Sequence, residues 1–280
     1  MATILMTGEL WFRVPEIIEV RLDGEAQKGV YPKDVILEVL GRIRADGAVY
    51  KAIDFTGSYV EKLNVAGRMT ICNMAVEMGA KTAYMQPNAD VLNYVDKRAV
   101  RPYEVQFTDP DFQYEESYVF DVSKIEPNLA CPSSVENVHP LSEVVANGPI
   151  KLNQGYIGSC TGGRVEDIAI AAKILKGRHI PEYTRLIVVP ASNEVMQECM
   201  KAGYIQDLMN AGATITTPGC GACLGAHEGI LAPGEVCITS TNRNFPGRMG
   251  STEALMYLAS PATVAASMVN GCITDPRDFL

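Results

Sequence analysis

The feature that most constrains the fold is an alternation of apolar, strand-like stretches with amphipathic, helix-like stretches along most of the chain. In the first half we expect strands and helices, in turn, over residues 14–22, 33–45, 48–55, 65–80 and 81–87. Gly79 stands near the expected end of the second helix, where glycine commonly forms a C-cap. Apolar strands alternating with helices predict an α/β fold with mostly parallel sheets covered on both faces.

A charged, aromatic and Pro-containing stretch, residues 96–115, interrupts this alternation, and we interpret it as a surface connection. We therefore predict two α/β domains, residues 1–105 and residues 106–280. The second is expected to open with a strand at 117–123 and a long loop at 126–140. Further strands are predicted over 154–159, 184–192, 213–219 and 235–242, and helices over 164–175, 193–203 (capped by Ser192 or Asn193) and 251–271, the last interrupted at Pro261.

Length, composition and charge restrict the class of protein. The chain has 280 residues, of which 47% are hydrophobic, and this is enough for a substantial core. A net charge of -9 argues against nucleic acid as a partner. No apolar run approaches the roughly 20 residues that cross a bilayer, and residues 1–16 lack the features of a secretory signal. We expect a soluble, cytoplasmic protein without a membrane partner.

Eight cysteines and three histidines are the candidate metal ligands. No two histidines are paired at helical ligand spacing, which argues against a zinc hydrolase. Four cysteines have apolar or helical neighbours and are expected to be small buried hydrophobic residues: Cys72, Cys199, Cys237 and Cys272. In a chain of this length, metal or catalytic roles are more plausible than disulfides for the paired Cys220 and Cys223.

Cys220 and Cys223 form a CxxC motif among several glycines, which let a backbone wrap closely around a bound group. The motif also fits a thioredoxin-like redox pair or a zinc knuckle. However, it is too glycine-rich to start a helix comfortably, and the chain lacks the second CxxC of a zinc ribbon. Together with Cys160, these thiolates could hold three corners of a cubane iron–sulfur cluster and leave the fourth iron open. Spacing alone leaves these alternatives open.

The special residues of the second half fall at corresponding places. Cys160, Cys220 and Asn242 each come just past the expected carboxyl end of a strand, where open α/β sheets bind ligands. Arg243 and Arg248 follow Asn242 in a turn, and guanidinium groups bind carboxylates in a bidentate manner. Taken alone, a basic loop of this kind is normally exposed to solvent. Its expected position at the same sheet edge as the cysteines favours a role in binding a carboxylate substrate.

Asn73 and Glu77 are four residues apart in an otherwise apolar helix, so their side chains share one face. A carboxylate and an amide on a largely buried face need hydrogen-bonding partners. Either they pair with local donors or they line a site, and the residues alone favour local pairing.

Several motifs occur together and in a fixed order: "GRMTICNMAVEMGAKT", "GSCT", "PGCGACLG", "NRNFPGRMGS" and the closing "YLASPATVAAS" and "ITDPR". Over essentially all 280 residues the sequence resembles the aconitase superfamily, most closely large subunits of 3-isopropylmalate dehydratase, with homoaconitase and dimethylmalate dehydratase as relatives. The resemblance implies aconitase-like three-layer α/β/α domains. It also implies a hydro-lyase of leucine or related amino-acid biosynthesis that dehydrates and rehydrates a hydroxy-diacid without net redox change.

The resemblance assigns a role to each matched residue. Cys160, Cys220 and Cys223 match the ligands of a [4Fe–4S] cluster whose fourth iron binds the substrate. Five further residues match substrate-binding or catalytic positions: Asn242 and Arg243 beside the cluster and substrate, Arg248 in the carboxylate-binding set, Asn73 near the cluster, and Glu77 near the hydroxyl that leaves. The implied partner is a small swivelling subunit that carries a catalytic serine.

Two departures from the family pattern stand out. The family usually has an asparagine after Cys-Thr, where this chain has Gly162. The family's N-terminal motifs with aspartate and histidine have no match, so we expect a chain lacking the N-terminal domain that is inactive by itself. Activity would then require a segment supplying that part and the small subunit. The alternative reading from another class is a non-catalytic binding or assembly module with the same fold, although such a module has no need of the retained cysteines and arginines.

Overall fold

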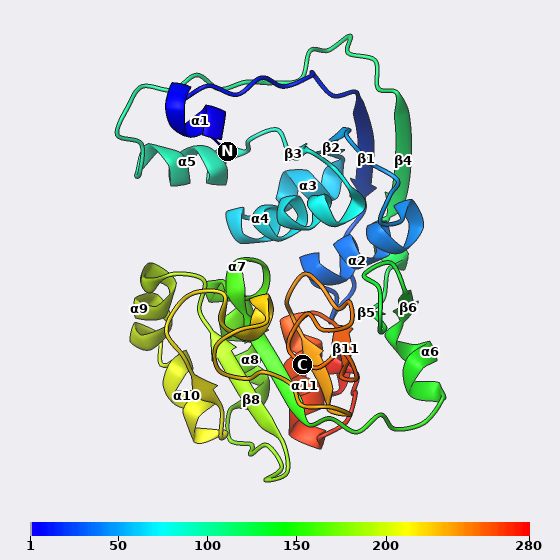
Figure 1. Ribbon diagram of the computed structural model, residues 1–280, viewed down its shortest axis with the longest axis vertical. Helices are drawn as coiled ribbons and strands as arrows, with labels where there is room; N and C mark the ends of the chain where they lie inside the picture. The colour runs from blue at the N-terminus through cyan, green and yellow to red at the C-terminus, as the bar shows by residue number, and fades with distance from the viewer. Residues whose placement is uncertain (1) are drawn as a thin grey trace.

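The computed structural model describes residues 2–280, in which two sheets carry the fold (Figure 1). The first sheet is entirely parallel and has the order β3-β2-β1-β4. Its strands are β1 (Ile17–Asp23), β2 (Ala52–Thr56), β3 (Thr82–Tyr84) and β4 (Glu116–Asp121). Among the described residues, no helix is long and apolar enough to cross a bilayer.

The second sheet has the order β6-β5-β11-β10-β7-β8-β9. It is parallel from β11 to β9, while β5 and β6 pair antiparallel at one side. Its strands are β5 (Asn128–Ala130), β6 (Val138–Pro140), β7 (Gln154–Gly158), β8 (Arg185–Val189), β9 (Thr214–Ile215), β10 (Val236–Thr239) and β11 (Leu255–Leu258). The expected α/β class with mostly parallel sheets is therefore confirmed.

The first half contains the following helices, of which the first and the last have no buried residues while the others pack around the first sheet. They are α1 (Ala2–Thr7), α2 (Pro32–Ile43), α3 (Ser58–Lys62), α4 (Val65–Met74), the 3₁₀ turn η1 (Ala75–Met78) and α5 (Ala89–Asp96). Helix α2 packs against α4 and also against β5 and β6, so it lies where the two sheets meet (Figure 1). The apolar core of the first sheet includes Ala130 and Leu258, which belong to the second sheet. The two halves therefore share a packed interface.

The second half contains η2 (Val122–Lys124), α6 (Leu141–Ala146), α7 (Ser159–Gly162), α8 (Val165–Leu175), α9 (Asn193–Lys201), α10 (Tyr204–Asn210), η3 (Gly221–Leu224), α11 (Pro261–Asn270) and η4 (Pro276–Phe279). Helices α8 and α11 pack against each other, and α11 also packs on β7 and β10. Their apolar faces form a second core with Ile157, Val188 and Ile238 of the central strands. This core holds the carboxyl ends of β7 and β10 side by side.

Several local predictions are confirmed. The helix expected at 65–80 is α4 continued by η1, and Gly79 ends it in a left-handed C-cap with φ 84°. Helix α9 begins as expected, because the Ser192 side chain accepts a hydrogen bond from the backbone N–H of Val195 at 3.2 Å. Residues 97–115 form an irregular connection without helix or strand.

Three predictions on the second half are wrong. The strand expected to open it is β4, which pairs with β1 and so belongs to the first sheet. The division into two domains stays a prediction, but this strand lies across the line drawn at residue 105. The first part of the helical region expected at 251–271 is strand β11, and the helix starts only at Pro261, whose fixed φ suits a first helical turn. Part of the loop expected at 126–140 forms the antiparallel strands β5 and β6.

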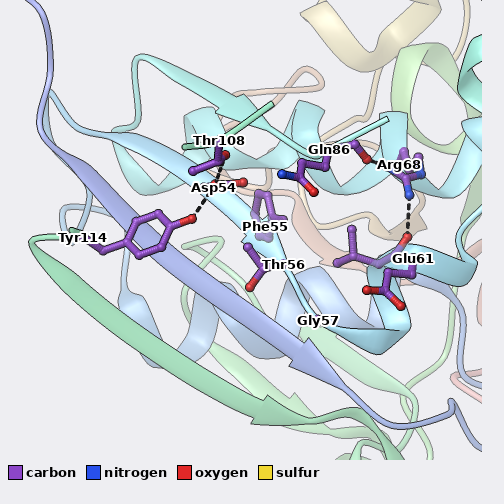
Figure 2. A pocket seen from close by; sticks show the side chains of 10 residues that line it. Asp54, Phe55, Thr56, Gly57, Glu61, Arg68, Gln86, Thr108 and Tyr114 are labelled. Atoms are coloured by element: carbon purple, nitrogen blue, oxygen red, sulfur yellow. Dashed lines mark hydrogen bonds between the residues drawn. The ribbon is translucent and has the colours of Figure 1, made fainter. Parts of the chain in front are cut away.

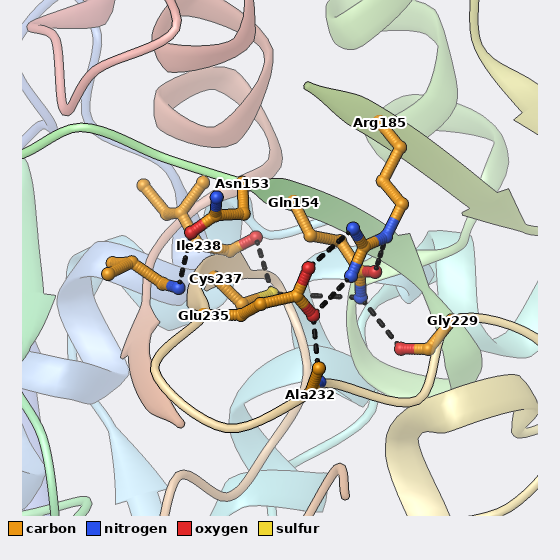
Figure 3. Close-up of polar contacts among 9 residues, drawn as sticks. Asn153, Gln154, Arg185, Gly229, Ala232, Glu235, Cys237 and Ile238 are labelled. Atoms are coloured by element: carbon orange, nitrogen blue, oxygen red, sulfur yellow. Dashed lines mark hydrogen bonds and ion pairs between the residues drawn. The ribbon is translucent and has the colours of Figure 1, made fainter. Parts of the chain in front are cut away.

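A polar network ties together the amino ends of the central strands (Figure 3). The Arg185 guanidinium donates to both carboxylate oxygens of Glu235, at 2.7 and 2.6 Å, and to Gln154 Oε1 at 2.6 Å. Gln154 begins β7, Arg185 begins β8, and Glu235 stands directly before β10. The network therefore fixes three strands at the end opposite to the one that carries the cysteines.

Candidate functional site

The three cysteines of the predicted cluster site lie in loops at the carboxyl end of the second sheet, which we call the cysteine edge. Cys160 follows β7 in the short helix α7 and is exposed. Cys220 follows β9 and is exposed, whereas Cys223 in η3 is buried, with 8% of its surface accessible. All eight cysteines of the chain are free thiols.

A buried tyrosine connects the two cysteine loops. Tyr156 lies in β7, four residues before Cys160, and its hydroxyl donates to the backbone oxygen of Cys220 at 2.7 Å. Burial raises the pKa of Tyr156, and the neighbouring Cys223 and Cys220 raise this pKa further. The tyrosine therefore stays a neutral hydrogen-bond donor that fixes the loop carrying Cys220 and Cys223 over the strand leading to Cys160.

The loop after β10 supplies the predicted polar residues and reaches the same edge. Its backbone at Arg248 touches the CxxC loop, where a Cβ at Gly225 would lie 3.0 Å from the Arg248 oxygen. Asn244 fixes the loop to the neighbouring backbone, because its side-chain amide donates to backbone oxygens including that of Cys131 at 2.8 Å. Asn244 was not predicted, and its role is to fix the loop.

The first half of the chain contributes Asn73 and Glu77 to this edge. Asn73 Nδ2 donates to Thr161 Oγ1 at 2.8 Å, directly beside Cys160. Glu77 accepts from Arg243 Nε at 2.9 and 3.0 Å through its two carboxylate oxygens. Asn73 and Glu77 therefore both have partners, but these are 88 and 166 positions away in the sequence and are not the local donors that the residues alone favoured. Three predicted residues take part in these contacts, and two more are sequence neighbours of residues that do: Asn73, Glu77, Arg243, Cys160 and Asn242.

Glu77 is a strongly buried carboxylate with one cationic partner. Its side chain is 8% exposed, whereas that of Arg243 is 39% exposed. Burial raises the pKa of Glu77, while the hydrogen bond and positive charge of Arg243 oppose this rise. Glu77 is consequently a group that can hold or release a proton closer to neutral pH than an exposed glutamate.

Four buried side-chain atoms in the loops of this edge have no hydrogen-bond partner among the described residues: Ser159 Oγ, Asn242 Oδ1, Asn244 Oδ1 and Arg248 Nε. Buried donors and acceptors are normally hydrogen-bonded, so unpaired ones indicate a place where a bound ligand can supply the missing hydrogen bonds. Within residues 2–280 no three His, Cys, Asp or Glu side chains are grouped closely enough for a single metal ion. A cluster differs from an ion here, because each thiolate binds a different iron. The donor set of three thiols thus suits an iron–sulfur cluster.

Sequence reasoning missed Lys33, a buried cation at the start of α2. Lys33 is 2% exposed, and its Nζ donates to the Thr241 oxygen at 2.6 Å and lies 3.4 Å from Met74 Sδ. Thr241 precedes Asn242 and Met74 follows Asn73 in the sequence. Lys33 therefore contacts the immediate sequence neighbours of two predicted site residues, through the backbone of Thr241 and the side chain of Met74.

The electrostatic surroundings of Lys33 place it among the candidate site residues. Burial lowers its pKa to about 8, and this is opposed first by Glu77 and then by Cys223, Asp167 and Cys160. Among the described residues no carboxylate lies within 4.0 Å of Lys33. The sequence did contain a signal for this residue. Lys33 lies in the first turn of α2, where the positive end of the helix dipole disfavours a cation, so a lysine at this position is unusual.

The structure gives a physical reason for Gly162. A Cβ at this position would lie 2.3 Å from Ser240 Oγ and 2.5 Å from Ser240 Cβ. Ser240 is fully buried, and its hydroxyl accepts from the Gly158 backbone N–H at 3.0 Å. A Cβ at position 162 would also lie 2.8 Å from the Ser240 backbone oxygen, so glycine allows a close approach to both the side chain and the backbone of Ser240.

The remaining cysteines behave partly as expected. Cys199 and Cys237 are fully buried, which confirms that prediction, and burial raises both pKa values to about 12. Cys72 and Cys272 are only partly buried, although Cys72 packs against the first apolar core, so for these two the predicted burial is incomplete.

Comparison with known proteins gives a consistent result. The sequence pattern of the aconitase family (aconitate hydratase) matches residues 1–271. The chain is 51% identical to 3-isopropylmalate dehydratase large subunit 1 of Methanopyrus kandleri, over 100% of this chain and 66% of that protein. It is 48% identical to the probable methanogen homoaconitase large subunits of Methanothermobacter thermautotrophicus and Methanosarcina mazei, over 99% of this chain and 64% and 69% of those proteins. The chain thus spans about two thirds of the length of these relatives.

Proposed function

This chain belongs to the aconitase family, and from that premise we propose that it is the cluster-binding component of a hydro-lyase. Its substrate is a hydroxy-diacid such as 3-isopropylmalate, which it dehydrates and rehydrates. The observation that carries the proposal is the convergence, at one sheet edge, of three free thiols with the unspent polar atoms of Asn242 and Arg248. A non-catalytic module has no need of this combination.

In this proposal Cys160, Cys220 and Cys223 hold a [4Fe–4S] cluster. The cluster, when bound, supplies a Lewis-acidic iron that polarises the substrate hydroxyl. A cytoplasmic location suits these thiols, because reducing compartments keep cysteines from forming disulfides.

The side chains around the cysteines supply binding and proton transfer. Arg248, whose Nε has no partner within residues 2–280, binds one substrate carboxylate, and Asn242 orients the substrate through its amide oxygen, which is also unpaired there. Arg243 holds Glu77 and reaches the second carboxylate with its remaining N–H groups. Glu77, with its raised pKa, passes a proton to the departing hydroxyl so that it leaves as water.

As the double bond forms, a base has to take the proton from the carbon next to the one that loses the hydroxyl. Rehydration then adds a hydroxyl and a proton to the same two carbons, with the two groups exchanged. We propose that this base comes from a small-subunit partner, because the relatives are named as large subunits. The second candidate function is a homoaconitase, which the names of two relatives favour. The two differ in the group carried by the substrate, so parallel assays with both diacids separate them.

The test is anaerobic reconstitution of the chain with iron and sulfide, in parent and Cys160→Ser forms, with Cys272→Ser as a control remote from the CxxC loop. We expect a brown protein with charge-transfer absorbance, which Cys160→Ser loses and Cys272→Ser keeps. Mixing with a small subunit, and with the remaining third of a relative's large subunit as a separate polypeptide, should produce absorbance of the unsaturated diacid. A colourless, zinc-loaded protein, or a cluster indifferent to Cys160→Ser, would refute the proposal.

A further inference from the structure

A cavity lies at the carboxyl edge of the first sheet, and none of its lining residues belongs to the cysteine edge. Its volume is about 150 Å³ (Figure 2). It is lined by Asp54, Phe55, Thr56, Gly57, Val60, Glu61, Arg68, Gln86, Thr108 and Tyr114. The carboxyl edge of a parallel sheet is where α/β proteins bind small ligands.

Asp54 is a buried carboxylate on this cavity with only one of its oxygens satisfied. It lies in β2 and is 3% exposed. Its Oδ2 accepts from Tyr114 Oη at 2.7 Å and from Thr108 Oγ1 at 2.9 Å (Figure 2). Its Oδ1 has no partner among the described residues. A buried carboxylate without a cationic partner is costly, so the cavity favours a ligand that brings positive charge.

Arg68 is a buried cation on the same cavity with donors to spare. It is 5% exposed and donates to the backbone oxygens of Leu63 at 3.0 Å, Gln86 at 2.8 Å and Val60 at 2.7 Å. A guanidinium has five N–H donors, so two remain. Within residues 2–280 no carboxylate lies within 4.0 Å of it. The cavity therefore also favours a ligand that brings negative charge.

Asp54 and Arg68 thus both line this cavity and are not paired with each other. We propose that this cavity binds a small zwitterion, an α-amino acid, with its ammonium group on Asp54 Oδ1 and its carboxylate on the free N–H groups of Arg68. A lone cation would leave Arg68 without a counter-charge, and a lone anion would do the same to Asp54.

The size and lining of the cavity restrict the amino acid. A volume of about 150 Å³ suits an amino acid with a small side chain better than one with a large side chain. Val60 and Phe55 give an apolar wall for that side chain. The site is distinct from the proposed hydro-lyase site, and its test does not depend on a cluster or on a small subunit.

The first test measures binding of alanine to the parent chain by calorimetry, with ethylamine and propionate as its two halves. We expect alanine to bind at millimolar concentration or tighter, each half at least tenfold more weakly, and phenylalanine more weakly than alanine. Absence of alanine binding up to about 50 mM would overturn the proposal. Ethylamine binding as tightly as alanine would equally overturn it, since the cavity would then be a simple cation site.

The second test is Asp54→Asn, which keeps the shape of the side chain and an oxygen for Tyr114 and Thr108 but removes the charge. We expect at least a tenfold loss of alanine affinity. The matched control is Glu61→Gln at the exposed rim of the same cavity, which should change affinity by less than about threefold. A folded Asp54→Asn variant, judged by its circular dichroism spectrum, that binds alanine like the parent contradicts the proposal. The analogue series on the parent decides the question if the variant does not fold.

Discussion

The two sheet edges of this molecule handle buried charge in opposite ways. At the cysteine edge, Glu77 from the first half meets Arg243 from the second at 2.9 Å, so the buried charge is balanced without a ligand. At the cavity of the first sheet, Asp54 of β2 and Arg68 of α4 are not paired with each other. The cysteine edge therefore depends on the two halves staying together, whereas charge balance in the cavity depends on what binds there.

The largest expected effect follows from breaking the ion pair across the halves. Arg243→Ala leaves Glu77 as an unpaired buried carboxylate. Removing one partner of a fully buried pair costs 3–5 kcal/mol, and because Arg243 is partly exposed we expect about 2 kcal/mol of lost unfolding free energy in urea. In the assembled enzyme we expect kcat/KM to fall by about three orders of magnitude, since a substrate-binding cation is lost as well.

The double variant Glu77→Gln with Arg243→Ala supplies the control for that prediction. It should recover about half of the lost stability, because no charge then remains unpaired, while activity stays low. If the double variant is as unstable as Arg243→Ala alone, the cysteine edge is not held by this charge pair and the contrast with the cavity fails.

The second prediction concerns close packing at the cysteine edge. Gly162→Asn would force a Cβ to within 2.3 Å of Ser240 Oγ, and overpacking of this kind costs about 1–3 kcal/mol. Urea unfolding should show a loss of about 2 kcal/mol. Combining it with Ser240→Gly, which removes both clashing side-chain atoms, should restore about half. A tolerated Gly162→Asn would show that the neighbouring strand end moves freely.

The third prediction concerns Lys33, the buried cation that faces Glu77 and the cysteines. Lys33→Met keeps the length of the side chain but removes the donor to the Thr241 oxygen and the positive charge. We expect unfolding free energy to change by less than about 1 kcal/mol, because burying an ammonium is itself costly. Loss of the reconstituted cluster, followed by its visible absorbance, should become about tenfold faster. An unchanged rate would leave Lys33 with a purely structural role.

The sequence predicts the cysteine edge better than the cavity, and the physical reason is the spacing of the residues. Cys160, Cys220 and Asn242 follow successive strand patterns, and parallel strands bring their carboxyl ends to one edge. The cavity instead unites Asp54 and Arg68 with Thr108 and Tyr114 from an irregular connection. Irregular connections follow no periodic pattern, so their contacts could not be predicted.

The errors within the fold have a similar origin. The stretch 251–271 contains many good helix formers, yet Leu255–Leu258 pairs with β10 and forms a strand. A short apolar run fits either structure, and tertiary pairing decides between them. Strand β4 was placed in the wrong half for a related reason, because no local pattern shows that it pairs with β1 across more than ninety residues.

The smallest expected effect comes from the pH dependence of the cavity. Burial raises the pKa of Asp54, and Tyr114 and Thr108 oppose this rise. A carboxyl whose pKa is higher in the folded than in the unfolded state binds protons more tightly when folded, so its contribution to stability is present at low pH. That contribution is lost as the pH rises above the unfolded value of about 3.9 towards the folded pKa.

Asp54→Asn should therefore make the melting temperature less dependent on pH above about pH 4, by about 2 °C or less, whereas Glu61→Gln should leave the dependence unchanged. Alanine should bind the parent more tightly as Asp54 ionises, so added alanine should cancel part of the same slope. The Glu77–Arg243 pair does not line the cavity. Alanine should therefore stabilise the parent and Arg243→Ala equally and leave the difference in stability between them unchanged. If alanine cancels no part of the slope in the parent, the charge of Asp54 is not what the ligand balances, and the two edges do not differ in the way described.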